Sequence, residues 1–460
     1  MSGPVALCVD LGSTYTKAAA VDLATGALLG TADHPTTLEP DVMVGFDAVR
    51  RELADVAPDP LVLACSSAGG GLRLAVVGYE REISAEAGQR AALSAGARVV
   101  HVSAGRLDDA AISALAATTP DVVLLVGGTD GGESSVLLHN AAALASSCAE
   151  MPVVVAGNSA VRQEVSAILE AKGVTVVATD NVLPDIGELA PEPARAAIRG
   201  VFLDHVIGGK RLSDDPAFVK LIRAVTPDAV LDGVTMLAEA LRSGVSPGSA
   251  GARPGGSVVV VDVGGATTDV YCVLSPDAEQ VMLGREAVGV PTQRRTVEGD
   301  LGLRWSPGAL LAAATDERLL ADHESESLQH WIAGRAGRSA PPETPIDRAY
   351  ELRLAGLAVT IALRRHVRAE AAYGVSRTTG ASARAASTVV LSGGAIRHAS
   401  AAERAALVTA VLEDRGGARG VLLDADVRCD SRYVLAAAGL LAVRYPDAAR
   451  VLVRGVGLIG

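Results

Sequence analysis

The chain has 460 residues, of which 49 % are apolar and only 3 % aromatic, and it carries a formal net charge of −12. This length allows two or three domains with large cores packed from Ala, Val, Leu and Gly. The negative charge argues against a general surface for nucleic acid or for anionic membranes. The five cysteines are odd in number and widely spaced, which is typical of reduced cysteines. No secretory signal is evident, and no apolar run approaches the roughly 20 residues of a membrane span, so we expect a cytoplasmic protein without membrane contact.

The first half of the chain predicts two kinds of α/β structure. Strands are expected at residues 5–9, 16–22, 27–32 and 61–65, with a helix near residues 46–56. From residue 83 to residue 179, short apolar strands then alternate with helices. This alternation is typical of a parallel sheet with right-handed crossovers. We therefore expect a small parallel α/β unit inserted in the first half.

The remaining elements are predicted as follows. Helices are expected at residues 191–206, 214–225 and 227–241, and residues 243–256, rich in Gly, Ser and Pro, form a boundary loop. Residues 257–290 repeat the N-terminal three-strand arrangement, and residues 296–302 form a polar loop. A long helix at 347–373 precedes a strand at 389–391, a helix at 401–413, a short strand at 420–423 and a helix at 433–443.

The domain prediction follows from these elements. Residues 1–82 are the N-terminal part of a first lobe, residues 83–180 the inserted unit, residues 181–256 a helical segment and linker that complete the first lobe, and residues 257–460 a second lobe.

One short hairpin sequence occurs twice. DLGSTYTK at residues 10–17 has a counterpart in DVGGATTD at residues 262–269, which begins 252 positions later. In both copies a carboxylate, Asp10 or Asp262, ends an apolar run, and a glycine follows two residues later. Seven positions after that acid stands Lys17 in the first copy and Asp269 in the second. Two such hairpins imply two related half-domains.

The two hairpins suit a polyphosphate. Because carboxylates alone repel phosphate, Asp10 and Asp262 are predicted to hold Mg²⁺, mostly through water. Lys17 is predicted to neutralise a phosphate and Asp269 to order metal-bound water. Further contacts are expected from glycines, which let the backbone approach, and from hydroxyls: Gly12, Ser13, Thr14, Thr16, Gly264, Gly265, Thr267 and Thr268. The alternative for either hairpin is a plain glycine turn with a surface aspartate.

A third element, VVLSGGAIR at residues 389–397, ends a strand in Gly393 and Gly394 and leads towards a helix. At such a junction the backbone can lie against a ribose or adenine, and a helix N-terminus favours an anion. The alternative is a plain turn.

These motifs and a later small-residue helix, AAAGLLA at residues 436–442, occur in the order of the ATPase superfamily that joins actin, the heat-shock chaperones and the sugar kinases. The chain resembles that superfamily over residues 5–36 and 257–442. The resemblance implies duplicated actin-like, ribonuclease H-like lobes around an ATP cleft. It places Asp10 and Asp262 at Mg²⁺ and the phosphates, Lys17 on phosphate, and Gly393 and Gly394 beside the nucleoside.

Within the superfamily, the phrases ACSSAGGGL at 64–72, LLVGGTDGG at 124–132 and RRTVEGDLG at 294–302 resemble the glutamate mutase accessory proteins, the MutL family. The resemblance implies an ATP-dependent chaperone that reactivates an adenosylcobalamin-dependent mutase by contacting its subunits. Nothing in the residues themselves specifies cobalamin, the client or the oligomeric state. The inserted unit is the hypothesised partner-recognition domain, or alternatively it only completes the core of the first half.

The residue that positions the attacking water is less defined by the sequence. Asp130 in GGTDGG is one candidate because it follows a strand, where α/β sheets collect ligands. Glu298 and Asp300 in VEGDLG are others. The alternatives are a tight turn and a charged surface turn. Arg364, Arg365 and Arg368 near a helix end fit the helix dipole, with a nucleotide-facing role as the alternative.

Two other functions remain open at this point. One is a small-molecule kinase of the same superfamily, although no sugar-kinase acceptor signature is present. The other is a nucleotide-gated scaffold that binds ATP without turnover.

Overall fold

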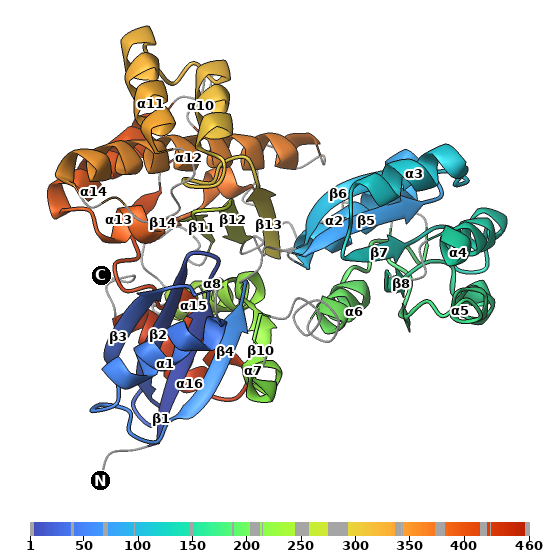
Figure 1. The fold of residues 1–460 in the computed structure, drawn as a ribbon, viewed down its shortest axis with the longest axis horizontal. Helices are drawn as coiled ribbons and strands as arrows, with labels where there is room; N and C mark the ends of the chain where they lie inside the picture. The colour runs from blue at the N-terminus through green and yellow to red at the C-terminus, as the bar shows by residue number, and fades with distance from the viewer. Residues whose placement is uncertain are drawn as a thin grey trace. The chain divides into compact units, whose positions relative to one another are not determined.

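The computed structural model describes fifteen stretches of the chain: residues 4–37, 41–67, 72–95, 97–147, 151–185, 188–202, 212–213, 215–243, 257–274, 293–335, 342, 344–372, 382–414, 421–423 and 425–455. The chain divides into two compact units. The first comprises residues 1–68, 226–283 and 291–460, and the second residues 69–225 and 284–290. Figure 1 shows the elements of each unit. The domain boundaries expected from the sequence stay predictions.

The first unit begins with an antiparallel meander. β1 (Val5–Leu11), β2 (Tyr15–Asp22) and β3 (Leu28–Pro35) are joined in chain order, and β4 (Leu61–Ser66) runs parallel to β1. Helix α1 (Val42–Glu52) begins where the Asp41 side chain accepts a hydrogen bond from the Met43 N–H. The predicted strands of this region are confirmed, and the helix expected near 46–56 is present but begins and ends four residues earlier.

A second sheet of the same unit repeats this arrangement. β11 (Val258–Val263) pairs with β12 (Thr268–Val273) antiparallel and with β14 (Thr388–Ser392) parallel, and β13 (Gln293–Glu298) and β15 (Asp426–Cys429) complete the order β13-β12-β11-β14-β15. In both hairpins the glycine N–H donates to a carbonyl three residues on, Gly12 to Tyr15 at 3.0 Å and Gly264 to Thr267 at 2.9 Å. The predicted duplication is confirmed.

Two predicted details of this half are wrong. The third strand is β13, whose last three residues fall in the expected polar loop at 296–302, and residues 275–292 lie outside the described part of the chain. Its polar residues suggested a loop, but Arg294 pairs with Glu370 at 3.0 Å and Arg295 with Asp269 at 2.8 Å inside the lobe. The short strand expected at 420–423 is β15 instead, a few residues later.

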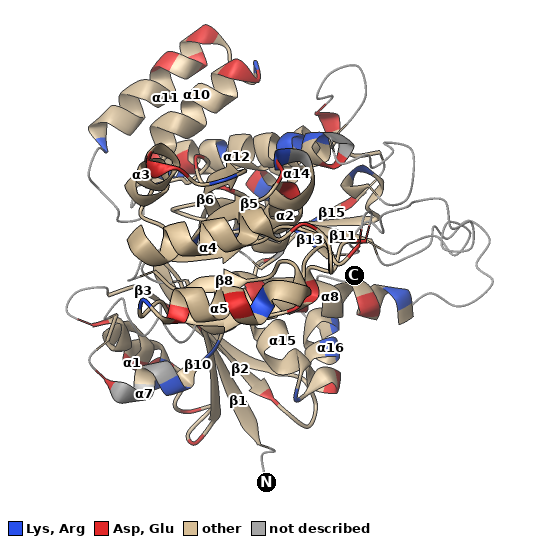
Figure 2. Cartoon of the chain, turned by 90° about the vertical axis from the view of Figure 1, so that its right-hand side faces the viewer, with Lys and Arg blue, Asp and Glu red and all other residues tan. Residues whose placement is uncertain are grey.

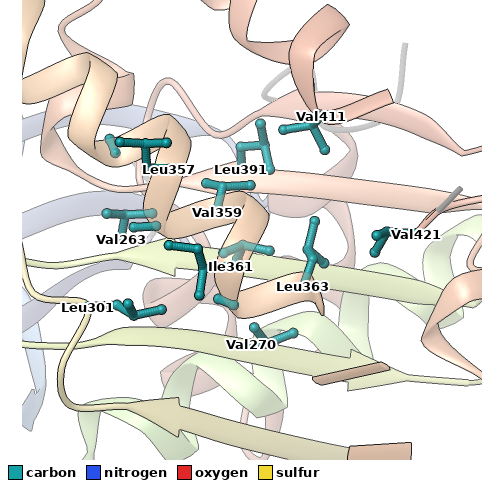
Figure 3. Packing of buried hydrophobic residues seen from close by; sticks show 14 of the residues in the cluster. Val263, Val270, Leu301, Leu357, Val359, Ile361, Leu363, Leu391, Val411 and Val421 are labelled. Atoms are coloured by element: carbon teal, nitrogen blue, oxygen red, sulfur yellow. The ribbon is translucent and has the colours of Figure 1, made fainter. Parts of the chain in front are cut away.

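Seven helices are described in the second half of the chain. They are α10 (Pro307–Asp316), α11 (Asp322–Gly334), α12 (Pro345–Ala372), α13 (Gly394–Arg397), α14 (Ala401–Glu413), α15 (Leu435–Ala442) and α16 (Pro446–Gly455). α12 covers one face of the second sheet. Figure 3 shows Leu357 and Ile361 of α12 directed towards Val263, Val270 and Leu391 of the strands. Because successive strand residues point to opposite faces, Val258 and Val260 face the other side.

The second unit is a parallel sheet with helices between its strands. β5 (Arg73–Gly78), β6 (Arg98–Ala104), β7 (Val122–Leu125), β8 (Val153–Val155) and β9 (Val176–Ala178) lie in the order β6-β5-β7-β8-β9. The predicted parallel unit is confirmed, although its first strand, β5, was not expected. The order is that of doubly wound folds, which bind ligands at the carboxyl ends of their strands.

The helices of the second unit's chain range follow the predicted alternation. A π-helical turn (Arg81–Ala85) leads into α2 (Glu86–Ser94), followed by α3 (Asp109–Ala117), α4 (Ser135–Ser147), α5 (Arg162–Glu170), α6 (Glu192–Val201) and α7 (Pro216–Leu221). The helix expected over 214–225 ends at Leu221, because Ile222–Val225 form strand β10.

Helices α5 and α16 carry both acidic and basic side chains. In Figure 2 these helices show red and blue positions, whereas β1 and β2 show few. None of the described helices is both long enough and apolar enough to cross a bilayer.

Helix α8 (Thr226–Ser243) and α15 make the closest helix contact of the first unit. α8 lies against β11 and β12 of the second sheet, and α15 lies against β1 and β4 of the first. The backbones touch at two glycines. A Cβ at Gly233 would be 2.0 Å from the Leu435 carbonyl oxygen, and one at Gly439 would be 1.7 Å from that of Ala229. The crossing therefore has no room for a methyl group.

We predict that Gly439→Ala lowers the free energy of unfolding by about 3 kcal/mol, because the added methyl separates two packed helices. Denaturant unfolding followed by circular dichroism measures the change. Gly308→Ala in α10 is the matched control, since a Cβ there meets nothing within 4 Å. Equal midpoints for the two variants contradict the prediction.

Candidate functional site

The tips of the two glycine hairpins lie against each other. A Cβ added at Gly265 would be 2.6 Å from the hydroxyl oxygen of Thr14. That oxygen is buried and has no hydrogen-bond partner among the described residues. Gly12 is also confined, because its Cβ would lie 2.7 Å from the Tyr15 carbonyl oxygen. Small residues thus let the two hairpins meet, whereas the predicted role of these glycines at phosphate stays a prediction.

Asp10 is the next-to-last residue of β1 and is enclosed, with 4 % of its surface exposed. The Thr226 hydroxyl, at the start of α8, donates to its Oδ1 at 2.5 Å, and the Cys65 thiol at the end of β4 lies 3.7 Å from the same oxygen. Burial raises the pKa of Asp10, and the charge of Lys17 opposes that shift. Lys17 is the direct partner of Asp10 in the β1–β2 register.

Asp262 occupies the equivalent position in the second hairpin. Its pKa is raised to about 6, chiefly by loss of solvation and also by the like charges of Asp269 and Asp10, while the charge of Lys17 opposes the shift. The charge of Asp10 therefore affects the pKa of Asp262, and the charge of Lys17 affects the pKa of both. Two desolvated carboxylates that share the effect of one ammonium group form a donor set that fits a hard divalent cation such as Mg²⁺.

Asp269 differs from Lys17 in its surroundings. Its Oδ1 accepts from the Arg295 guanidinium at 2.8 Å, and its Oδ2 accepts from the Thr267 hydroxyl at 3.0 Å. Arg295 was missed by the sequence reasoning, although it stands in the RRTVEGDLG phrase. Its pairing leaves Asp269 as a fixed, charge-compensated carboxylate beside Asp262.

Two of the hydroxyls predicted to bind phosphate are buried and contact other groups of the protein instead. Thr16 and Thr268, at equivalent positions, are both 0 % exposed. The Thr268 hydroxyl donates to the Leu301 carbonyl at 2.8 Å, and the Thr16 hydroxyl lies 3.4 Å from that of Thr36. These contacts disfavour a direct bond from either residue to phosphate. Ser13, Thr14 and Thr267 stay predictions.

A cavity of about 680 Å³ opens beside the first hairpin and beside Arg304, which lies against Gly265 of the second. Lys17, Arg304, Gly394, Arg397 and Tyr433 are among its lining residues. The cavity is therefore bordered by the first hairpin and by the SGGAIR segment together, as the predicted nucleoside position requires. Arg397 also lies 3.5 Å from Asp33 of β3, which joins the two sheets of this unit at the cavity.

Gly393 and Gly394 have separate structural roles. Gly393 has φ +126°, and a Cβ there would be 2.2 Å from the Val263 carbonyl oxygen, so only glycine fits between β14 and β11. Gly394 opens α13 and is exposed to the cavity, with nothing within 4 Å of an added Cβ. The predicted strand-to-helix junction is confirmed.

Tyr433 and Asp430 were not found from the sequence. The Lys17 ammonium lies 3.2 Å from the centroid of the Tyr433 ring, and the Tyr433 hydroxyl is 3.4 Å from Oδ2 of Asp262. Asp430, 2 % exposed, accepts hydrogen bonds from the backbone N–H groups of Arg432 and Tyr433. No pattern in the DSRY sequence at 430–433 signals these contacts. They depend on the loop after β15 reaching Lys17 and Asp262 of the two hairpins.

The VEGDLG segment is tied to helix α12. Arg365 contacts Glu298 at 2.7 Å and Asp300 at 2.8 and 2.9 Å. Both acids proposed to position water are thus engaged by a guanidinium. Arg364 pairs with Glu317 and Asp414, and Arg368 with Glu317. The interpretation that these arginines serve the helix dipole is incomplete, since each binds acidic side chains of other segments.

Gly302 lets the VEGDLG segment pack closely against the second hairpin. A Cβ there would be 2.3 Å from the Ala266 carbonyl oxygen. The backbone of the next residues continues the contact, because Leu303 donates to the Gly264 carbonyl and Arg304 to that of Gly265. The segment therefore supports the second hairpin from behind.

Asp130 belongs to the second unit and closes the GGTDGG turn there. Its Oδ1 accepts from the Ser159 N–H and the Asn181 side chain, each at 2.9 Å. These contacts match the alternative interpretation of a tight turn, and the suggested catalytic role of Asp130 stays a prediction.

Comparison with known proteins gives the following findings. A profile described as MutL protein matches residues 6–455. Protein MutL from Clostridium tetanomorphum is 35 % identical over 372 residues, which cover 78 % of each chain. Among solved structures, nucleotide-free acetone carboxylase is similar with a TM-score of 0.39 and 14 % identity, covering 95 % of this chain and 70 % of that one.

Two further solved structures are similar over most of both chains. One is the activator of 2-hydroxyisocaproyl-CoA dehydratase from Clostridium difficile with bound ADPNP, at a TM-score of 0.29, 11 % identity and coverage of 97 % and 96 %. The other is the ROK hexokinase from Thermus thermophilus, at a TM-score of 0.28 and 12 % identity. That comparison covers 96 % of this chain and 98 % of the hexokinase. By the profile over almost its whole length and by its identity to a curated relative, the chain belongs to the MutL protein family, the glutamate mutase-associated family that its motifs resemble.

Proposed function

We propose that this protein binds and slowly hydrolyses ATP with Mg²⁺, and that it uses this cycle as a chaperone that reactivates an adenosylcobalamin-dependent mutase. The observation that carries the nucleotide part is the meeting of two acid-glycine hairpins beside a cavity of about 680 Å³. The family membership supports the client part.

The residues of the site take distinct roles in this proposal. Lys17 neutralises phosphate charge at the first hairpin, and the Gly12, Gly264 and Gly265 turns let the backbone approach the phosphate chain. Asp10 and Asp262 would hold Mg²⁺, which when bound offsets the phosphate charge. Gly394 and Arg397 border the nucleoside end of the cavity.

Hydrolysis needs a group that orients the attacking water. Asp269 is suited to this because Arg295 and Thr267 fix its carboxylate next to Asp262. Glu298 and Asp300 are less suited, since Arg365 ties both to α12 and it is Asp269 that pairs with Asp262 in the sheet.

The client contact is assigned to the second unit. Its doubly wound parallel sheet is a separate compact body and has no counterpart in the repeated hairpin lobes. We propose that it recognises the cobalamin-binding part of the mutase, while nucleotide binding in the first unit changes the affinity of the complex.

Phosphate release measured with and without the mutase tests the whole proposal. Slow release that the mutase changes is the expected result. Rapid release only with a small hydroxylated metabolite would instead indicate a kinase, and none under any condition a scaffold.

The two hairpins are predicted to respond differently to mutation. Lys17→Ala weakens ATP binding about tenfold or more, because one phosphate charge loses its partner. Asp269→Ala mainly slows hydrolysis, by roughly 100-fold, and leaves ATP affinity within about threefold. Calorimetry with ATP and single-turnover phosphate release separate the two effects. Equal losses of binding in both variants contradict this division.

Removal of one acid is predicted to uncouple the metal from the nucleotide. Asp262→Asn keeps the shape of the side chain but removes its charge, so Mg²⁺ no longer strengthens ATP binding. Titrations of ATP with Mg²⁺ and with EDTA give the ratio of affinities, which falls towards one in the variant. Asp447→Asn, on the surface of α16, is the control and keeps the wild-type ratio. An unchanged ratio in Asp262→Asn would falsify the proposed ligand.

Removal of the second unit is predicted to abolish client binding alone. Residues 72–202, which contain β5 to β9 and α2 to α6, are replaced by a short Gly-Ser linker, so that the hairpin lobes remain. ATP binding persists, and the variant no longer co-purifies with the mutase. Full-length Lys17→Ala is the control that keeps the second unit. Retained reactivation of the mutase by the shortened chain rules out this recognition role.

A further inference from the structure

Tyr433 makes contact with both hairpins at once. Its ring lies 3.2 Å from the Lys17 ammonium of the first, and its hydroxyl is 3.4 Å from the Asp262 carboxylate of the second. It also lines the cavity. A single side chain therefore covers the cation and the carboxylate that the proposed function assigns to phosphate and Mg²⁺.

The backbone at Tyr433 is held in an unusual conformation. Its φ of +55° lies in the left-handed region, which is rare for a bulky side chain. The buried Asp430 carboxylate maintains it by accepting from the Tyr433 N–H at 2.6 Å and the Arg432 N–H at 3.1 Å. Strained residues of this kind persist where surrounding contacts hold them.

Tyr433 is also connected to the central helix pair. Only Val434 separates it from α15, whose Gly439 touches α8 without space for a methyl group. Tyr433 therefore stands two residues ahead of a helix that contacts the other half of the first unit.

We propose that Tyr433 is a competitive gate on the nucleotide site: its ring and the phosphates of ATP use the same face of Lys17, so binding of ATP displaces the ring and moves the start of α15. The proposal rests on the proposed ATP function and adds to it the residue that senses the phosphates. Cation–π contact with Lys17 is what the nucleotide must replace.

Binding measurements on two variants test the gate. Tyr433→Leu removes the ring and the hydroxyl while keeping an apolar side chain, and it is expected to tighten binding of a non-hydrolysable ATP analogue about tenfold. Tyr433→Phe keeps the ring over Lys17 and stays within about threefold of the wild type. Tyr350→Leu, which removes a tyrosine stacked on Trp331, is the control and leaves the affinity unchanged. Circular dichroism confirms that each variant is folded.

The outcomes separate the gate from the ATP function itself. If the wild type binds the analogue and folded Tyr433→Leu binds it equally or more weakly, the gate is wrong and the ATP function stands. If neither binds it, both are wrong. If only Tyr433→Leu binds it, the gate is supported in its strongest form.

Hydroxyl-radical footprinting of the wild-type protein tests the same point without a variant. Displacement of the ring predicts greater oxidation of Tyr433 when the analogue and Mg²⁺ are added, relative to Tyr350 in the same sample. Equal or lower oxidation of Tyr433 overturns the proposal.

Discussion

The contact between α8 and α15 is the constraint on which the site depends. Their backbones meet at Gly233 and Gly439, and each helix begins next to a residue that reaches a hairpin acid. Thr226 of α8 donates to Asp10, and Tyr433, ahead of α15, lies at Asp262. The helices thus fix the distance between the sheets, and their first residues set the surroundings of the two carboxylates. A larger residue at the crossing would move both acids apart.

The carboxylates of the site differ in how far positive charge compensates them. Asp10, Asp262 and Asp430 all have pKa values raised by burial, whereas Asp269 has its own guanidinium in Arg295. Lys17 is shared by the first three through its electrostatic effect. Burial of several carboxylates around one ammonium is unfavourable unless further positive charge arrives. A ligand that brings a divalent cation, as in the proposed function, would relieve this imbalance.

The sequence predicted those elements whose structure depends on neighbouring residues in the chain. A turn of four residues needs glycine at a set position, so DLGS and DVGG revealed both hairpins, and alternating strands and helices revealed the parallel unit. Strand β13 was placed wrongly because its arginines are compensated by Glu370 and Asp269, which lie far away in the chain. Tyr433 was missed for the same reason: its partners Lys17 and Asp262 stand more than a hundred residues before it. Contacts of this range leave no periodic signal in one sequence.

The surroundings of Asp10 have a mechanical consequence for the second unit. The chain leaves the first unit just after β4, where Cys65 lies against Asp10, and it returns at Thr226, whose hydroxyl is bonded to the same carboxylate. Entry and exit of the whole intervening segment are thus anchored on one side chain. A force applied to that segment would therefore be transmitted to the Asp10 carboxylate, which is also the register partner of Lys17 in the first hairpin.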